Sequence, residues 1–262
     1  MMVIDCHAHI YHKKLAARAV KGVGEFYDVP MSCSGTTEEL AEIASRGKVN
    51  RFIVNSVAMN AKSVKKLNDF VAQECSAHSE FIGLGTLYPD LENIDEEIDR
   101  IISSGLKGIK LHPDTQNFDA DCPAAMKMYE KISGRLPLLI HSGDYRYDRS
   151  HPKRIANIID SFPGLTVVAA HLGGWSIFEE AVPYMKDRNN YMDISSVMPF
   201  MKPDRVYELI KLYGADRLMF GSDFPMWDPE KEYEDFMKLP FSDEEREKIL
   251  WKNAADVFGI EV

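Results

Sequence analysis

The chain has 262 residues, 45% of them hydrophobic, and a formal net charge of -10. This acidic balance argues against a nucleic-acid partner, which requires a basic face to neutralise phosphates. The length suits one domain over residues 1–262, and the sequence has neither an apolar run of membrane-spanning length nor a CxxC pair among its four cysteines, so we expect a reduced, cytoplasmic chain with no membrane partner.

Short apolar runs of strand length recur along the chain. In order, they are MVIDCHAHI, RFIVNSV, FIGLGTLY, LKGIKLH, PLLIHSG, TVVAAHLGG, YMDISSV and LMFGSDF. Several of these runs are apolar on both alternations, which is typical of strands that are covered on both faces.

Amphipathic helical patterns lie between most of these runs. Thr36 with Glu39, and Ser242 with Glu245, have the spacing of capping boxes, and Pro123 stands where a helix would begin. Strand and helix alternate eight times, which predicts an α/β protein with the (β/α)8 TIM-barrel fold. The competing doubly wound sheet needs a Gly-rich phosphate turn after the first strand, where HAHIYHKK stands instead.

Two histidines end the first predicted strand. Residues i and i+2 of a strand point to the same face, so His7 and His9 project together, with Asp5 one layer below. In a barrel that face is the interior, and active sites form at the C-terminal strand ends. A shared divalent metal would explain two neutral imidazoles side by side, although an HxH pair alone is a weak signal.

Three later runs also end in a side chain that can bind a metal. His141 ends the fifth run, His171 the sixth, and Asp223 the eighth. A lone strand-end histidine is more often a core residue, but this repetition at matching strand ends predicts one metal site at the barrel mouth. Such nitrogen and oxygen ligands suit Zn²⁺, with Mn²⁺, Co²⁺ and Fe²⁺ as alternatives, and the number of ions, one or two, stays open.

The D-x-H-x-H start, the AHLGG and GSDFP stretches and the ILWKNAADVFGI ending resemble the amidohydrolase superfamily. The closer similarity is to its amidohydrolase-2 branch, which includes the aminocarboxymuconate-semialdehyde decarboxylase-like enzymes, and it spans the chain from first strand to last helix. The resemblance implies that His7, His9 and His141 are metal ligands. It also implies that Asp223 is a ligand that handles a proton, and that His171 is a ligand of a second metal or a base beside the first.

Lys110 and His112 share one face of the fourth predicted strand, in GIKLHPD. The resemblance implies two possibilities for Lys110, since some superfamily members carry a carboxylated lysine that bridges two metals, whereas decarboxylase-like members use one metal and no such lysine. The alternative is an ion pair with a nearby carboxylate or with the substrate, because an unpaired buried ammonium is unfavourable. His112 is expected to contact the substrate or to hydrogen-bond behind the ligands.

Loops after the strands are expected to set substrate specificity. The long loop of roughly residues 11–35 is expected to form a lid or a subunit contact. Arg146 and Arg149 closely follow His141, and their guanidinium groups could bind a substrate carboxylate through two hydrogen bonds. Trp175 is expected to line the pocket. The alternatives are surface arginines and a tryptophan that only packs.

The leading prediction is a metal-dependent hydrolase that uses a metal-activated water on a small-molecule amide, lactam or lactone, that is, on a C–N or C–O bond. The alternative is a metal-dependent, non-oxidative decarboxylase of a small cyclic or unsaturated carboxylic acid. A TatD-type DNase is disfavoured by GLGTLYP in place of a GEIGLD-like stretch, and a non-catalytic metal-binding protein by the intact ligand set. Members of this family often form dimers, so a homodimer is expected.

Overall fold

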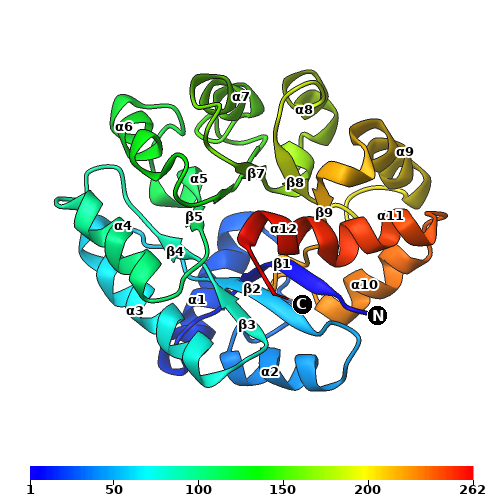
Figure 1. Ribbon diagram of the computed structural model, residues 1–262. Coiled ribbons are helices and arrows are strands. Elements are labelled where there is room, and N and C mark those ends of the chain that lie inside the picture. The colour runs from blue at the N-terminus through cyan, green and yellow to red at the C-terminus, as the bar shows by residue number, and fades with distance from the viewer. Residues whose placement is uncertain (262) are drawn as a thin grey trace.

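The computed structural model describes residues 1–261. Parallel strands form a central barrel ringed by helices (Figure 1). The strands are β1 (Ile4–His9), β2 (Arg51–Asn55), β3 (Phe81–Gly83), β4 (Gly85–Thr86), β5 (Ile109–Leu111), β6 (Leu138–Ile140), β7 (Val167–Ala169), β8 (Tyr191–Asp193) and β9 (Leu218–Met219). The ring closes where the N–H of Cys6 donates to Phe220 O (2.9 Å) and that of His9 donates to Phe224 O (2.7 Å). The predicted (β/α)8 barrel is confirmed.

The third predicted strand is divided at Leu84, between β3 and β4. β3 pairs with β2 and β4 pairs with β5, so the chain changes its main neighbour at this point. Helices α3 (Ala61–Ala77) and α4 (Ile94–Ser103) pack closely here, since a Cβ atom on Gly83 would lie 2.9 Å from Val71 Cγ1 and one on Gly85 would lie 2.9 Å from Ile101 Cδ1. Glycines at both positions therefore let this stretch of barrel approach its covering helices.

Helices connect the strands and cover the outside of the barrel. They are α1 (Lys13–Tyr27), α2 (Thr37–Ser45), α3 (Ala61–Ala77), α4 (Ile94–Ser103), α5 (Pro113–Gln116), α6 (Pro123–Ile132), α7 (Pro152–Ser161), α8 (Phe178–Met185), α9 (Pro203–Tyr213), α10 (Pro229–Met237), α11 (Asp243–Glu247) and α12 (Asn253–Phe258). Ser242 and Glu245 form the predicted capping box at α11. At α2 only half of the predicted box forms: Thr36 Oγ1 accepts from Glu39 N–H (3.3 Å), but the Glu39 carboxylate accepts from Ser34 instead.

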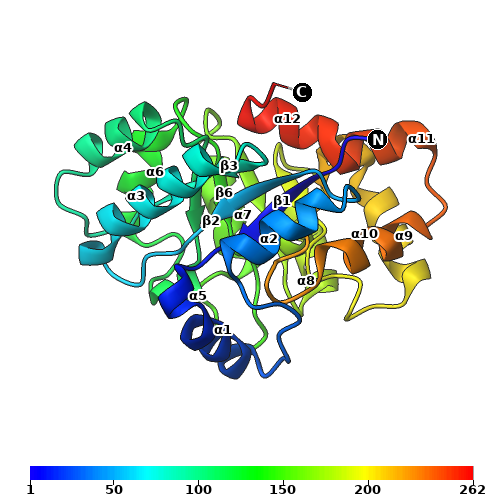
Figure 2. The ribbon, with the colours of Figure 1, turned by 90° about the horizontal axis from the view of Figure 1, so that it is seen from below.

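The barrel interior has an apolar end and a polar end. The apolar end holds one cluster from the strands and the last helix: Ile4, Cys6, Ile53, Leu84, Leu139, Val168, Ala170, Met219, Ala254, Ala255 and Phe258. Figures 1 and 2 show α12 across this end of the barrel, while Figure 2 shows α1 at the opposite end. The polar strand ends point toward α1, so α1 covers the side on which the predicted site lies.

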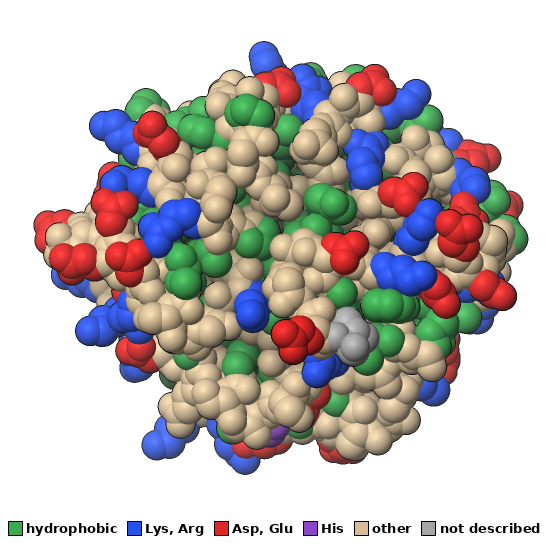
Figure 3. Space-filling view, in the orientation of Figure 1, with side chains coloured by type: hydrophobic (Ala, Val, Ile, Leu, Met, Phe, Trp, Pro, Cys, Tyr) green, Lys and Arg blue, Asp and Glu red, His purple; other side chains and the backbone are tan. Residues whose placement is uncertain are grey.

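Side chains of both charges are spread over the surface of the protein. On the face shown in Figure 3, acidic and basic side chains are interspersed around the rim rather than gathered into a basic stripe. None of the helices in residues 1–261 combines the length and the hydropathy that crossing a bilayer requires.

Glu232 on α10 is a buried carboxylate whose Oε2 has no hydrogen-bond partner within residues 1–261. Burial raises its pKa from 4.5 to about 8. Because the pKa of Glu232 is higher in the folded state than in the unfolded state, the folded state is favoured most at low pH, where the carboxyl is protonated in both states. This contribution to the free energy of unfolding falls as the pH rises from 4.5 to about 8. Glu232→Gln removes the titration, so the unfolding free energy of the wild type should fall by about 2–3 kcal/mol more than that of the variant between about pH 6 and pH 9.

Urea denaturation of both proteins at the two pH values measures this difference. Exposed Glu92, changed to Gln, is the matched control and should follow the wild type. Parallel losses of stability in the wild type and Glu232→Gln would contradict the prediction.

Candidate metal centre

His7, His9 and Asp223 converge at the polar end of the barrel. The Nε2 atoms of His7 and His9 lie 3.1 Å apart. Asp223 follows β9, and its Oδ1 lies 3.5 Å from His7 Nε2 and 3.4 Å from His9 Nε2. The three side chains are almost wholly shielded from solvent, and burial lowers the pKa of His7 to about 4 and also lowers that of His9. Both imidazoles are therefore neutral near pH 7, as metal ligation requires.

Asp193, at the end of β8, fixes the tautomer of His7. Its Oδ2 lies 2.9 Å from His7 Nδ1, and its Oδ1 accepts from Ser195 Oγ (2.5 Å). Burial alone would raise the pKa of Asp193, but His7 and His171 hold it below its usual range. An ionised carboxylate only accepts hydrogen bonds, so His7 Nδ1 carries the proton. The Nε2 lone pair of His7 consequently points at His9 and Asp223, as in carboxylate–histidine–metal arrangements.

His141 and His171 form a second pair of facing imidazoles. His141 follows β6, and its Nε2 lies 2.9 Å from Gly143 O; His171 follows β7, and its Nδ1 lies 3.0 Å from Ser195 O. Carbonyl oxygens only accept, so these two nitrogens carry the protons and leave lone pairs on His141 Nδ1 and His171 Nε2. Those two atoms lie 3.1 Å apart. Burial lowers the pKa of His141, which disfavours a proton shared between these two nitrogens, and both could therefore serve as ligands of a metal ion.

Lys110, at the centre of β5, points into the same cluster. Its ammonium Nζ lies 2.7 Å from His7 Nε2 and therefore donates to the lone pair that a metal would use. Within residues 1–261, no carboxylate oxygen lies within 4.0 Å of Nζ, so the alternative of an ion pair with a protein carboxylate is not realised. Burial lowers the pKa of Lys110 to about 8. Carboxylation and pairing with a substrate anion remain the open alternatives.

The donor set fits a divalent ion. The imidazole nitrogens of His7 and His9 face each other, as do those of His141 and His171, and the Asp223 carboxylate lies beside the first pair. Burial opposes ionisation of Asp223, but His7, His171 and His9 together hold its pKa below the usual range. Neutral imidazole and carboxylate are the ligands that Zn²⁺ and related ions prefer.

His112 and Trp175 lie with Tyr27 beside this cluster. The His112 ring stacks on His141 with centroids 3.9 Å apart, and its Nε2 lies 2.5 Å from the hydroxyl of Tyr27, the last residue of α1. Tyr27 in turn packs edge-on against Trp175 at 4.7 Å. The end of α1 thus reaches the strand-end histidines. The segment of residues 11–35, predicted as a long loop, contains this helix.

The guanidinium of Arg146 is already engaged. Its Nε and Nη2 donate to the Asp144 carboxylate (2.9 and 2.6 Å), its Nη1 donates to Phe26 O, and it lies 4.8 Å from the centre of the Phe26 ring. The guanidinium N–H groups that would bind a substrate carboxylate are therefore already hydrogen-bonded, and Arg146 instead holds the end of α1 in place. Arg149 donates to Asn117 Oδ1 (2.7 Å).

Asp193, Ser195 and Tyr27 are not among the site residues predicted from sequence. Asp193 carried the same signal as the others, a carboxylate ending an apolar run, in YMDISSV. Tyr27 had no such signal, because it is the last residue of α1, a helix in the connection after β1, and does not stand at a strand end.

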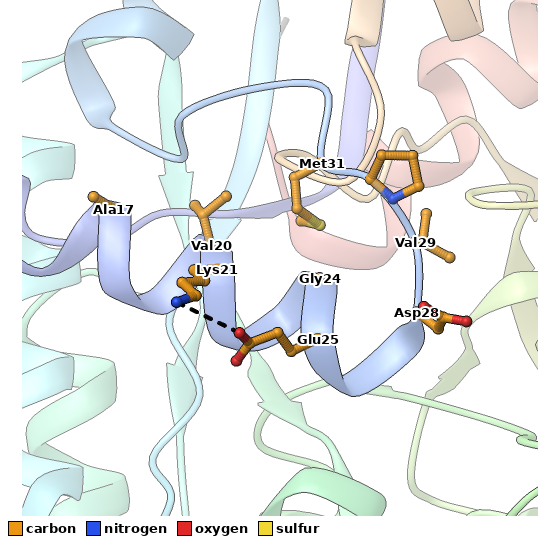
Figure 4. Close-up of a pocket in the computed structure, with 9 residues that line it drawn as sticks. Ala17, Val20, Lys21, Gly24, Glu25, Asp28, Val29 and Met31 are labelled. Carbon is orange, nitrogen blue, oxygen red and sulfur yellow. Dashed lines mark ion pairs between the residues drawn. The ribbon is translucent and has the colours of Figure 1, made fainter.

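An open groove of about 580 Å³ runs along α1, away from these residues (Figure 4). Its lining is Ala17, Val20, Lys21, Gly24, Glu25, Asp28, Val29, Pro30 and Met31. Lys21 and Glu25 form an ion pair across one side of it, at 3.6 Å. The lining includes none of the residues predicted for the site, so the candidate chemistry lies at the strand ends.

Comparison with solved structures shows the same fold in proteins of low identity. An uncharacterised TIM-barrel protein from Bordetella bronchiseptica is 20% identical, with a TM-score of 0.80 and 99% of each chain covered. A dihydroxybenzoic acid decarboxylase from Polaromonas, with bound manganese and the inhibitor 2-nitroresorcinol, is 16% identical, with a TM-score of 0.75 and coverage of 99% of this chain and 97% of that one.

A third similar structure is a probable 2-pyrone-4,6-dicarboxylic acid hydrolase from Acinetobacter baumannii, with citric acid bound. It is 16% identical, with a TM-score of 0.72 and coverage of 99% of this chain and all of that one. No curated protein matched the sequence. The family described as Amidohydrolase matches residues 4–260. This match covers nearly the whole sequence, and the chain therefore belongs to the amidohydrolase family.

Proposed function

We propose that the protein is a metal-dependent hydrolase that cleaves a C–N or C–O bond of a small molecule, such as an amide, lactam or lactone. The observation that carries this proposal is the pair of facing imidazole couples, His7 with His9 and His141 with His171, beside the Asp223 carboxylate. Membership of the amidohydrolase family supports the same class of enzyme.

In this proposal, His7, His9 and Asp223 hold the ion, with His141 and His171 as further ligands or partners. When bound, a divalent ion polarises a substrate carbonyl and lowers the pKa of a water molecule. Asp223 Oδ1 faces the reacting space, so it takes the proton from the attacking water and delivers it to the leaving group. His171 is held through Nδ1 by Ser195 O and presents Nε2 to the same space as a ligand or base.

A metal-dependent decarboxylase of a cyclic or unsaturated acid is the second candidate, and Lys110 favours it. This buried ammonium has no carboxylate partner within residues 1–261, and a substrate carboxylate would supply one. The Polaromonas protein of the same fold is a decarboxylase with bound manganese. His112 and Trp175 are proposed substrate contacts in either case, while Arg146 acts by holding α1 in place.

We further propose zinc as the ion, with manganese, cobalt or iron as alternatives, in a single domain over residues 1–262. The four cysteines are free, which agrees with a cytoplasmic protein. We propose a homodimer whose only other partner is the small-molecule substrate. Light scattering of the purified protein tests the dimer.

The function is tested by assaying protein that has been stripped with a chelator and reloaded with Zn²⁺ or Mn²⁺. A panel of lactones, lactams and amides is scored by product mass, and a panel of cyclic and unsaturated acids by CO2 release. Turnover of a member of the first panel, dependent on metal, supports the hydrolase. CO2 release without hydrolysis would replace it by the decarboxylase, and identical rates in stripped and loaded protein would contradict both.

Lys110→Ala should change the metal content. Because Lys110 Nζ lies 2.7 Å from His7 Nε2, a carboxylated Lys110 would help to hold two ions, and elemental analysis should then find about two ions per chain in the wild type and one or none in the variant. Exposed Lys107, changed to Ala, is the matched control and should match the wild type. About one ion in both proteins would contradict the bridge and shift the proposal toward one-metal chemistry.

A further inference from the structure

Asp223 is held from behind by two side chains outside the ligand set. Its Oδ2 accepts from the hydroxyl of Ser196 (2.8 Å), and Ser196 Oγ accepts from the indole Nε1–H of Trp227 (2.9 Å). Ser196 follows β8 and is fully buried, whereas Trp227 lies in the segment after β9 and is half-buried. Neither residue was predicted from the sequence to belong to the site.

Chemistry fixes the direction of this chain of hydrogen bonds. An indole N–H only donates, so Ser196 Oγ must accept from Trp227, and its own single proton is free for one acceptor. Two acceptors are in reach, Asp223 Oδ2 at 2.8 Å and the thioether sulfur of Met226 at 3.7 Å. The ionised carboxylate is both closer and the stronger acceptor, so the proton points at Oδ2.

The backbone holds both residues in an uncommon conformation. Ser196 has φ 54° and Asp223 has φ 62°, in the left-handed region that residues other than glycine rarely adopt. The N–H of Asp223 donates to His7 O (2.8 Å), which ties Asp223 to the first strand. With the backbone fixed by β1 and Oδ2 fixed by Ser196, Oδ1 is the oxygen that remains to face His7 and His9.

We propose that Trp227 and Ser196 are positioning residues that select which oxygen of Asp223 faces the metal. The proposal rests on the proposed function, in which Asp223 is a ligand and proton acceptor. Removing the Ser196 hydroxyl frees Asp223 to rotate, and removing the Trp227 N–H frees the hydroxyl to turn away. Partners of this kind behind a ligand commonly change metal affinity about tenfold to a hundredfold.

The test is Mn²⁺ affinity, measured on stripped protein by the electron paramagnetic resonance signal of free Mn²⁺. Ser196→Ala should weaken binding about tenfold or more, and Trp227→Phe, which keeps a ring against Phe200, should weaken it by a smaller factor. The double variant should bind no more weakly than Ser196→Ala alone, because Trp227 acts only through Ser196. If the Trp227 ring only supported the structure, the double variant would bind Mn²⁺ more weakly than Ser196→Ala alone.

Trp251→Phe is the matched control. Trp251 is half-buried like Trp227, but it lies between α11 and α12 and packs on the apolar cluster at the other end of the barrel, so its loss should leave Mn²⁺ affinity unchanged. If the wild type binds Mn²⁺ and both test variants bind it equally well, the positioning role is wrong and the proposed function stands. If the wild type binds no metal, the proposed function fails and this role fails with it. Should Ser196→Ala not fold, the comparison of Trp227→Phe with Trp251→Phe decides.

Discussion

Changing His7 and His9 together to Ala is expected to abolish metal binding and to lower kcat/KM on the order of 10³-fold or more. The two Nε2 atoms lie 3.1 Å apart, and the variant removes both of these candidate ligand nitrogens. Elemental analysis and turnover measure the two effects on the same sample.

His78→Gln is the control for a lost imidazole, because His78 follows α3 and lies beside Glu80 on the outside of the barrel. It should keep the metal content and the activity of the wild type. Unchanged metal content and activity in the His7 and His9 double variant would remove the basis of the proposed function.

Asp223→Asn is expected to separate proton transfer from metal binding. An amide keeps the shape of the carboxylate and one oxygen ligand but does not take up a proton, so kcat should fall by about 10²–10⁴-fold while part of the bound metal is retained. Steady-state kinetics with metal analysis on the same preparation would show the two effects apart.

Asp216→Asn, an exposed change on the turn before β9, is the matched control and should leave both quantities unaltered. If the activity of Asp223→Asn fell only in proportion to its metal content, Asp223 would be a metal ligand without a role in proton transfer.

The fold was predictable because its signals are local and repeated. Eight apolar runs and the capping residues at α11 specify strands and helices one at a time, and parallel strands joined by helices have few ways to pack. The exceptions have tertiary causes. The strand is divided at Leu84 because β3 pairs with β2 whereas β4 pairs with β5. The Glu39 carboxylate does not complete its capping box because it accepts hydrogen bonds from the backbone N–H and the hydroxyl of Ser34.

The candidate site was predictable to the extent that it follows the strand ends. His7, His9, His141 and His171 stand at strand ends and Lys110 lies within β5, and the structure brings their side chains into one cluster. What could not be predicted is how each group is paired.

Pairing depends on contacts between segments far apart in sequence. From the sequence, the Arg146 guanidinium was predicted to be available to a substrate carboxylate. In the structure it instead donates hydrogen bonds to Asp144 and to the backbone at the end of α1. Tyr27 ends helix α1 and Trp227 lies in the segment after β9, so neither stands at a strand end, and only their contacts with His112 and Ser196 connect them to the site.

The position of α12 has a consequence for synthesis on the ribosome. Ala254, Ala255 and Phe258 complete the apolar cluster inside the barrel, together with side chains from β1 at the other end of the described sequence. A nascent chain cannot fill this interior until Phe258 has left the exit tunnel, however early its first strands are made. Contacts of such long sequence separation slow folding. The apolar end of the barrel would therefore be completed only after translation has passed the last helix.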